Sequence, residues 1–206
     1  MLASLAAVAR TPGRSPVTEL LYLSAVDAEV LGAAVDRLIP PWGSHPGAAA
    51  LGAVDYIDGL LGAFLVDPPR IFAGGPFSGR AGGDASFGKF MPLRPVEELA
   101  WRTRIEGSQG RPEREFNGPV IGWQEQYRTG IDALGADFAR VDGAEQDRRL
   151  AAASAFRVLL YVHANEACYG APEYGGNRDG RGWAAIKFPG DSQPRGYTDE
   201  EVSGRA

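Results

Sequence analysis

The sequence predicts a mainly α-helical domain with long loops rich in glycine, proline and aromatic residues, an irregular C-terminal tail and little or no β-structure. A chain of 206 residues fits one domain and can bury roughly 70% of the surface that its unfolded form exposes. The composition, 44% hydrophobic and 23% charged, is typical of a globular protein. Apolar residues recur at helical spacing in several segments, and 28 glycines and 15 prolines interrupt them.

The bulk composition argues against several function classes. A net charge of −5 does not suggest a nucleic-acid partner, because phosphate binding needs clustered lysine and arginine. No apolar run approaches the ~20 residues of a membrane span. Cys168 is the single cysteine, so the chain can build neither an internal disulfide nor a cysteine-ligated zinc site. The histidines are His45 and His163, so a metal site would depend mainly on carboxylates.

Residues 1–19 are predicted to be a flexible N-terminal segment. A short apolar run, Leu2 to Ala9, stands before Arg10 and Arg14, whereas an export signal carries its positive charge first. We therefore favour a cytoplasmic location. The alternative is a residual or mis-started export signal, with the protein in the periplasm as part of an exported complex.

Two helices are expected in the first third of the domain. Ser24 can cap the first, with Asp27 three residues later, and Pro40 and Pro41 stop it. Its apolar stripe comprises Val26, Val30, Leu31, Ala34, Val35, Leu38 and Ile39. The second helix is expected over about 48–65. Its buried face comprises Leu51, Val54, Ile57, Leu61 and Phe64, with Asp55 and Asp58 on another face.

A long loop is expected over 67–93. It is glycine-rich, but Lys89 is followed by Phe90 where a phosphate-binding loop needs serine or threonine. Four phenylalanines must be buried against the domain itself or against a partner chain. They are Phe72, Phe77, Phe87 and Phe90.

Three more helices follow, over about 96–105, 120–140 and 142–168. Pro119 suits the first turn of the middle one, in which five apolar residues recur at helical spacing: Trp123, Tyr127, Ile131, Leu134 and Phe138. Asp142 and Glu145 form a capping box for the last. The one candidate strand is 183–188, after a turn at Asp179-Gly180. The predicted organisation is a single domain over 20–190 and a tail over 191–206.

His163 and Glu166 stand three residues apart on one face of the last long helix. This is the reverse of the Glu-x-x-His order of a di-iron bundle, and a second pair is missing from the predicted helices. We expect both side chains to hydrogen-bond the glycine-rich loop that follows and to support it. Cys168 and His163 point about 140° apart on a helix, so they do not make a nucleophile–base pair.

The segment "YGAPEYGGNRDGRGWAAIKFPG", residues 169–190, is the most specialised part of the sequence. Gly175, Gly176 and Asn177 suit left-handed backbone. The segment does not match a calcium-binding EF-hand, because Ile186 stands where that loop requires an acidic residue. The candidate scaffold or partner-interface residues are Tyr174, Gly175, Gly176, Asn177, Arg178, Asp179, Trp183 and Phe188. Two roles are compatible: a folded loop that caps the domain's own core, and a surface that docks on a partner.

The chain resembles the gluconate 2-dehydrogenase subunit 3 family over about residues 20–190. The opening "LSAVDAEVLGAAVDRLIPP" and "PGAAALGAVDYIDGLL" resemble the family's first helix pair. The C-terminal "HANEACYGAPEYGGNRDGRGWAAIKFPG" resembles its most distinctive stretch, and "AGGPF" and "EQYRTGIDAL" also fit.

The resemblance implies a non-catalytic small subunit that binds and stabilises, and helps to mature, a large FAD-dependent oxidoreductase of the glucose–methanol–choline type. FAD is then expected in the partner and no cofactor in this chain, with a separate electron-transfer protein as a further partner. Many relatives carry a twin-arginine signal, which is not seen here, so a role as export escort is not predicted.

Two other functions stay open from the residues alone. One is an independent enzyme with a site near His163 and Glu166. The other is a carbohydrate-binding module in which Trp183 and Tyr174 stack on sugar rings.

Overall fold

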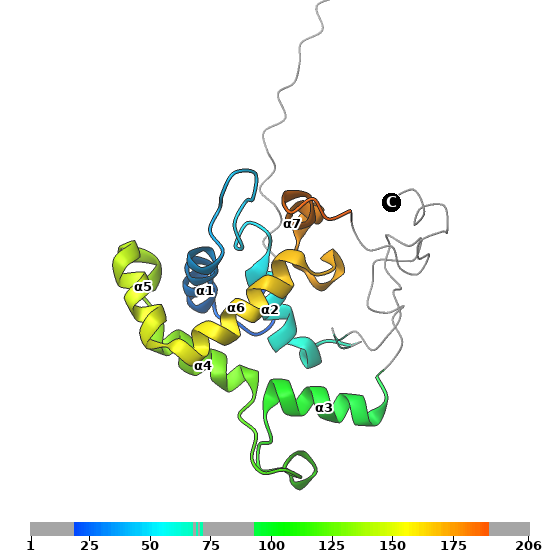
Figure 1. The fold of residues 1–206 in the computed structure, drawn as a ribbon. Helices are drawn as coiled ribbons and strands as arrows, with labels where there is room; N and C mark the ends of the chain where they lie inside the picture. The colour runs from blue at the N-terminus through cyan, green and yellow to red at the C-terminus, as the bar shows by residue number, and fades with distance from the viewer. Residues whose placement is uncertain (1–18, 68, 70, 72–92, 190–206) are drawn as a thin grey trace, which may run out of the picture.

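The computed structural model describes residues 19–67, 69, 71 and 93–189 (Figure 1). In this part of the chain seven α-helices and several 3-10 helices form the fold, without a β-strand, which confirms a mainly α-helical protein. The phenylalanines of 72–92 lie outside the described residues, as do residues 1–18 and 190–206. The proposed domain limits therefore stay predictions.

Helix α1, Ala25–Leu38, forms as its capping residues predict. The Ser24 hydroxyl accepts a hydrogen bond from the Asp27 amide, and the Asp27 carboxylate accepts one from the Ser24 amide in return. Its core face comprises Val30, Leu31, Ala34 and Val35. This helix therefore begins and ends close to its predicted limits.

Helix α2, Ala53–Leu61, is shorter than predicted at both ends. Gly52 precedes it with a φ of 90°, and a Cβ there would lie 2.8 Å from the Gly175 carbonyl oxygen. Asp58 is buried, contrary to expectation, and its carboxylate accepts hydrogen bonds of 2.7–2.9 Å from the amides of Leu21, Tyr22 and Leu23. The carboxylate thus fastens the chain entering the domain to α2.

Helix α3, Pro95–Glu106, matches its prediction, whereas α4 is confined to Trp123–Leu134. Gly122 caps α4 and packs so closely on the backbone at Gly107 that a side chain would collide with it. Gly135, with a φ of 86°, ends the helix. Pro119 therefore lies before the helix rather than in its first turn.

The predicted long helix over 142–168 is two helices, α5 (Gly143–Ala152) and α6 (Ser154–Tyr169). Asp142 caps α5 as predicted, by accepting from the Glu145 amide at 2.9 Å. Ala153 leaves helical geometry, with a ψ of 46°, and the chain turns a corner there (Figure 1). The corner lets α5 pack on α1 while α6 crosses α2, α4 and α7.

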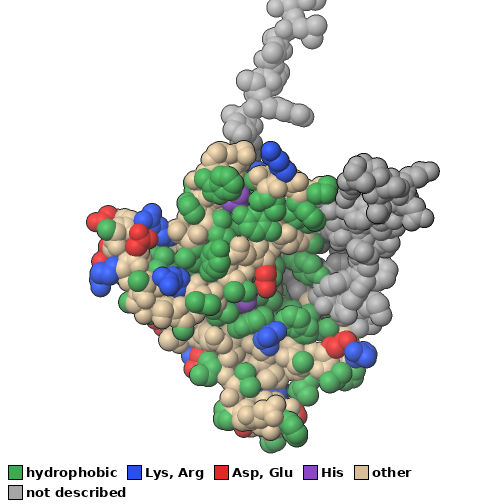
Figure 2. Space-filling model, in the orientation of Figure 1, with side chains coloured by type: hydrophobic (Ala, Val, Ile, Leu, Met, Phe, Trp, Pro, Cys, Tyr) green, Lys and Arg blue, Asp and Glu red, His purple; other side chains and the backbone are tan. Residues whose placement is uncertain are grey.

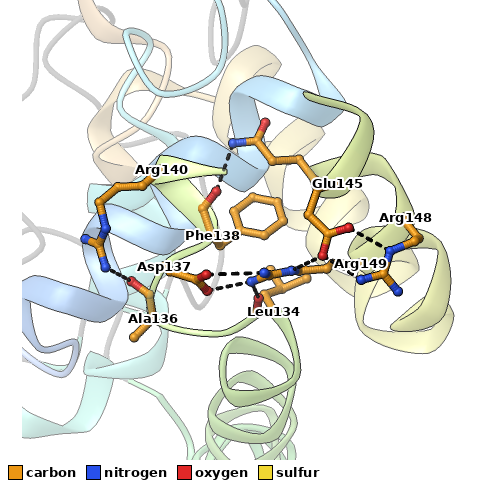
Figure 3. A network of polar contacts seen from close by, with 9 residues as sticks. Leu134, Ala136, Asp137, Phe138, Arg140, Glu145, Arg148 and Arg149 are labelled. Carbon is orange, nitrogen blue, oxygen red and sulfur yellow. Dashed lines mark hydrogen bonds and ion pairs between the residues drawn. The ribbon is translucent and has the colours of Figure 1, made fainter. Parts of the chain in front are cut away.

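An arginine network fixes α5 against the end of α4 (Figure 3). Arg149 donates to Glu145 and Asp137 at 2.7 and 2.6 Å, and to the Leu134 carbonyl at 2.8 Å. Hydrogen bonds from Arg148 and Arg149 hold the pKa of Glu145 well below its usual range. The Glu145 side chain serves this network instead of completing a capping box.

The main core lies between α1, α2, α4 and α6. Its largest fully buried side chains include Leu31, Leu51, Ile57, Tyr127, Phe138 and Leu160. A smaller cluster around Ala63, Ile71 and Ile105 packs under α3. Each fully buried large apolar side chain contributes roughly 1.5–3 kcal/mol, so these helices are held mainly by burial.

The segment predicted as a strand over 183–188 begins instead as helix α7, Arg181–Ala185. Gly180, with a φ of 66°, turns the chain, and the Gly182 amide donates to the Asn177 side chain at 2.9 Å. A side-chain oxygen thus satisfies an amide at the start of this helix, and the prediction of a strand is wrong.

Candidate functional site

The loop of residues 170–180 folds back on the C-terminal end of α6, and Asn177 is its centre. Asn177 is fully buried, with left-handed backbone at a φ of 43°. Its amide donates to the Ala167 carbonyl at 2.6 Å, and its side chain donates to the Gly170 carbonyl at 2.9 Å. Its side-chain oxygen accepts from the amides of Gly182 and Trp183. One side chain therefore joins the end of α6 to the start of α7.

Glycines allow this close approach. A Cβ on Gly176 would collide with the Ala167 carbonyl, and one on Gly182 with the Cys168 carbonyl. Gly175 has a φ of 96°, which side chains disfavour. Glycine is needed at these positions because the loop backbone packs directly against the backbone at the end of α6.

Arg178 and Trp183 attach the loop to two helices. The Arg178 guanidinium pairs with Asp55 of α2, and its amide donates to the Leu51 carbonyl. Trp183 is 8% exposed, and its ring Nε1 donates to the Tyr169 carbonyl at 2.6 Å. The loop therefore caps the domain's own core, one of the two predicted roles.

The outer side of the loop stays accessible. Arg178, Asp179 and Phe188 are exposed, Tyr174 is half-buried, and the Phe188 ring packs edge-on against Trp183. Asp179 has left-handed backbone, with a φ of 58°. Whether a partner meets this side is not tested by these contacts, so docking by the loop stays a prediction.

His163 and Glu166 bind helices rather than the loop, contrary to the predicted supporting role. His163 Nδ1 and the Tyr127 hydroxyl share a buried hydrogen bond of 2.9 Å. The Glu166 carboxylate accepts from the Tyr56 hydroxyl at 3.0 Å. These bonds tie α6 to α4 and α2, two helices that the sequence pattern could not place beside it.

The His163 ring is held neutral by its surroundings. It lies edge-on to Trp123, with ring centroids 4.6 Å apart, and parallel to Tyr127. Burial, helped by the positive charge of Arg104, lowers the pKa of His163 to about 4. Burial also raises the pKa of the Cys168 thiol to about 12, so this cysteine is a packing residue rather than a thiolate.

A groove of about 510 Å³, here called the aromatic groove, runs along α6 over His163. It is lined mainly by aromatic and apolar side chains of α2, α3, α4 and α6. They include Tyr56, Leu60, Trp101, Trp123, Val158 and Val162, with Arg104 and Glu166 as the charged members.

A second groove, of about 540 Å³, lies between α4 and the corner where α5 meets α6. Ala155 lines both grooves, so they meet at the first turn of α6. Figure 2 shows hydrophobic side chains gathered over the face on which α6 lies. The two grooves and the exposed side of α6 together form one apolar band.

Within the described residues, no helix is both long and apolar enough to cross a bilayer. The same residues hold no cluster of three or more histidine, cysteine, aspartate or glutamate side chains suited to a metal ion.

A comparison with protein-family models matches residues 25–190 to the family described as gluconate 2-dehydrogenase subunit 3. The chain belongs to that family. Searches of curated proteins and of solved structures returned no significant match.

The sequence pattern of this family member did not predict the apolar band. Its members Tyr56, Trp101, Arg104, Val158 and Val162 come from three helices, and only folding brings them together. One signal was available: α6 carries apolar residues on more than one face, which a helix buried on one side does not need.

Proposed function

We propose that this chain is the non-catalytic small subunit of a dehydrogenase complex and that it binds and stabilises an FAD-dependent oxidoreductase of the glucose–methanol–choline type. The substrate of that partner would be a sugar, a polyol or a glycoside. FAD would reside in the partner, and a separate electron-transfer protein would accept the electrons.

The match over residues 25–190 to a family of dehydrogenase subunits carries this proposal. The apolar band on α6 supports it, because large exposed patches on a folded domain mark interaction sites. The loop supports it as well, since it closes the domain's own core and leaves the band as a separate surface.

One observation favours a second candidate, an independent enzyme: His163 and Glu166 both line the aromatic groove. A catalytic base works best with a pKa near the working pH, whereas the pKa of His163 is about 4. Its bond to Tyr127 and that of Glu166 to Tyr56 give both side chains structural partners. We therefore prefer the accessory subunit.

Affinity capture of the full-length tagged chain from its native host tests the proposal. We expect a co-purifying large protein that shows a flavin absorbance spectrum, is identified by mass spectrometry as a glucose–methanol–choline-type oxidoreductase, and reduces a dye when sugars or polyols are added. Recovery of the chain alone, folded and colourless, would contradict the proposal and favour the second candidate.

A further inference from the structure

Helix α6 carries an apolar stripe on its outer side. Val158, Tyr161 and Val162 are 60%, 49% and 47% exposed, and their spacing places them on one face. The opposite face is buried in the core through Phe156, Leu160, Ala164 and Ala167. Scattered exposed apolar residues are ordinary, but these three share one face, and Val158 and Val162 also line the aromatic groove.

The composition of the aromatic groove is that of a binding hot spot. Trp101, Trp123 and Tyr56 line it, with an arginine beside them, and such side chains carry much of the binding energy at interfaces. Across α6, Ile121 lines the second groove and is 63% exposed. The apolar surface therefore continues over the helix from one groove into the other.

The charges at the edges of this band are unbalanced. The Arg104 guanidinium lies 5.2 Å from the centre of the Trp123 ring, and no described carboxylate pairs with it. Its neighbour Arg102, by contrast, is paired with both Glu98 and Glu106. Arg157, one turn before Tyr161, also lacks a carboxylate partner among the described residues.

The carboxylates at the band have described hydrogen-bond or ion-pair partners, although Glu166, like Arg104, forms no ion pair among the described residues. Glu166 accepts from the Tyr56 hydroxyl, and Glu125 lies 3.9 Å from Arg128. Cations without a partner beside an apolar surface attract carboxylates of opposite charge, and complementary charges of this kind select the partner and fix its orientation. The band thus fits a surface with an apolar centre and a carboxylate opposite Arg104.

Resting on the proposed function, we infer that the flavoprotein subunit docks on the outer side of α6. An apolar side chain of that subunit enters the aromatic groove, and a carboxylate of that subunit pairs with Arg104. The Tyr174–Asp179 loop then acts on docking indirectly, by fixing the C-terminal end of α6.

The test uses capture of the flavoprotein by the full-length tagged chain and by variants. Val158→Asp places an anion at the centre of the band and should weaken capture about tenfold or more. Arg104→Glu should weaken it comparably, and Arg104→Lys less. Val26→Asp is the matched control, since Val26 is 51% exposed on α1 and lines neither groove. Arg111→Glu is the control for charge reversal.

Each outcome bears on the inference. The inference is supported if the Val158→Asp and Arg104→Glu variants capture less flavoprotein while both control variants capture as much as the wild type. Undiminished capture by both band variants overturns it but leaves the proposed function standing, because the wild-type chain still binds the flavoprotein. If the wild-type chain captures no flavoprotein, the proposed function and the inference fall together.

Two further measurements test the inference, the first of them with the wild-type chain only. Hydrogen exchange on the wild-type complex should show protection of α3 and α6 relative to the free chain, and protection elsewhere alone would overturn the inference. Sedimentation of the isolated chain tests whether a second copy of this chain, rather than the flavoprotein, covers the band. If the chain forms a dimer that Val158→Asp abolishes, the band is a dimer interface and the inference is overturned.

Discussion

At the scale of single residues, the two side chains that organise the C-terminal third of the domain are His163 and Asn177. Both are buried and polar, and each hydrogen-bonds a neighbouring element. Buried polar groups stabilise a fold only when they are paired, so these positions are sensitive to changes that remove one partner.

The free energy of unfolding of the domain should fall as the pH is lowered and His163 becomes protonated. Its folded pKa of about 4 lies below the ordinary value of 6.5, so between these pH values the unfolded chain binds a proton that the folded chain does not. This contribution to stability is complete above the ordinary pKa and is lost as pH falls toward the folded pKa. Between about pH 7.5 and about pH 5, we expect a loss of about 2 kcal/mol.

Chemical denaturation at both pH values measures this loss. His163→Asn should show a smaller loss between the same two pH values, whatever its absolute stability. Burial also lowers the pKa of His45, so protonation of His45 would reduce stability over the same pH range. Making both measurements in a His45→Gln background therefore isolates the effect of His163. Equal losses in wild type and His163→Asn would contradict the prediction.

Asn177→Ala should destabilise the domain by about 2–3 kcal/mol, because it leaves the Gly170 carbonyl and the Gly182 amide without their partner. The matched control is Asn165→Ala on α6, where the side chain bonds only the Tyr161 carbonyl and is partly exposed. That change should cost no more than about 0.5 kcal/mol. Thermal unfolding measures both, and equal effects would show that the loop does not depend on Asn177.

At the scale of elements, glycine decides how closely two helices approach. Gly130 of α4 is buried against the Phe156 ring of α6, and a Cβ there would collide with it. Gly32 of α1 is different, since the nearest atom to its Cβ position is the Val54 Cγ2 at 3.9 Å.

The same substitution should therefore have opposite effects at these two glycines. Gly32→Ala should stabilise the protein by up to about 1 kcal/mol through helix propensity, whereas Gly130→Ala should destabilise it by about 1–3 kcal/mol through overpacking. Denaturant midpoints of the two variants provide the comparison. A stabilising Gly130→Ala would mean that α4 and α6 can separate without cost.

At the scale of the whole molecule, the residues that the structure describes close a core yet leave the apolar band uncovered. We expect the isolated full-length chain to bind a hydrophobic dye, because such dyes require contiguous apolar surface. Val158→Asp should reduce dye fluorescence clearly, and Val26→Asp should change it little. Equal fluorescence from wild type and Val158→Asp would place the dye-binding surface elsewhere.

The sequence by itself determined the helical class, the start of α1 at Ser24 and the special nature of the Tyr174–Asp179 segment, because periodicity, capping and glycine requirements are local. It misjudged where α2 and α4 begin and where α5 ends, since those limits depend on close backbone contacts at Gly52 and Gly122 and on the corner at Ala153.

Only the tertiary structure decided what the polar side chains of α6 do and where the exposed apolar surface lies. His163 and Glu166 take partners 36 and 110 residues away in the chain, which no local pattern specifies. The apolar band joins five helices, α2 to α6, for the same reason. Local sequence fixes which atoms need a partner, and the packing of distant helices selects the atoms that provide one.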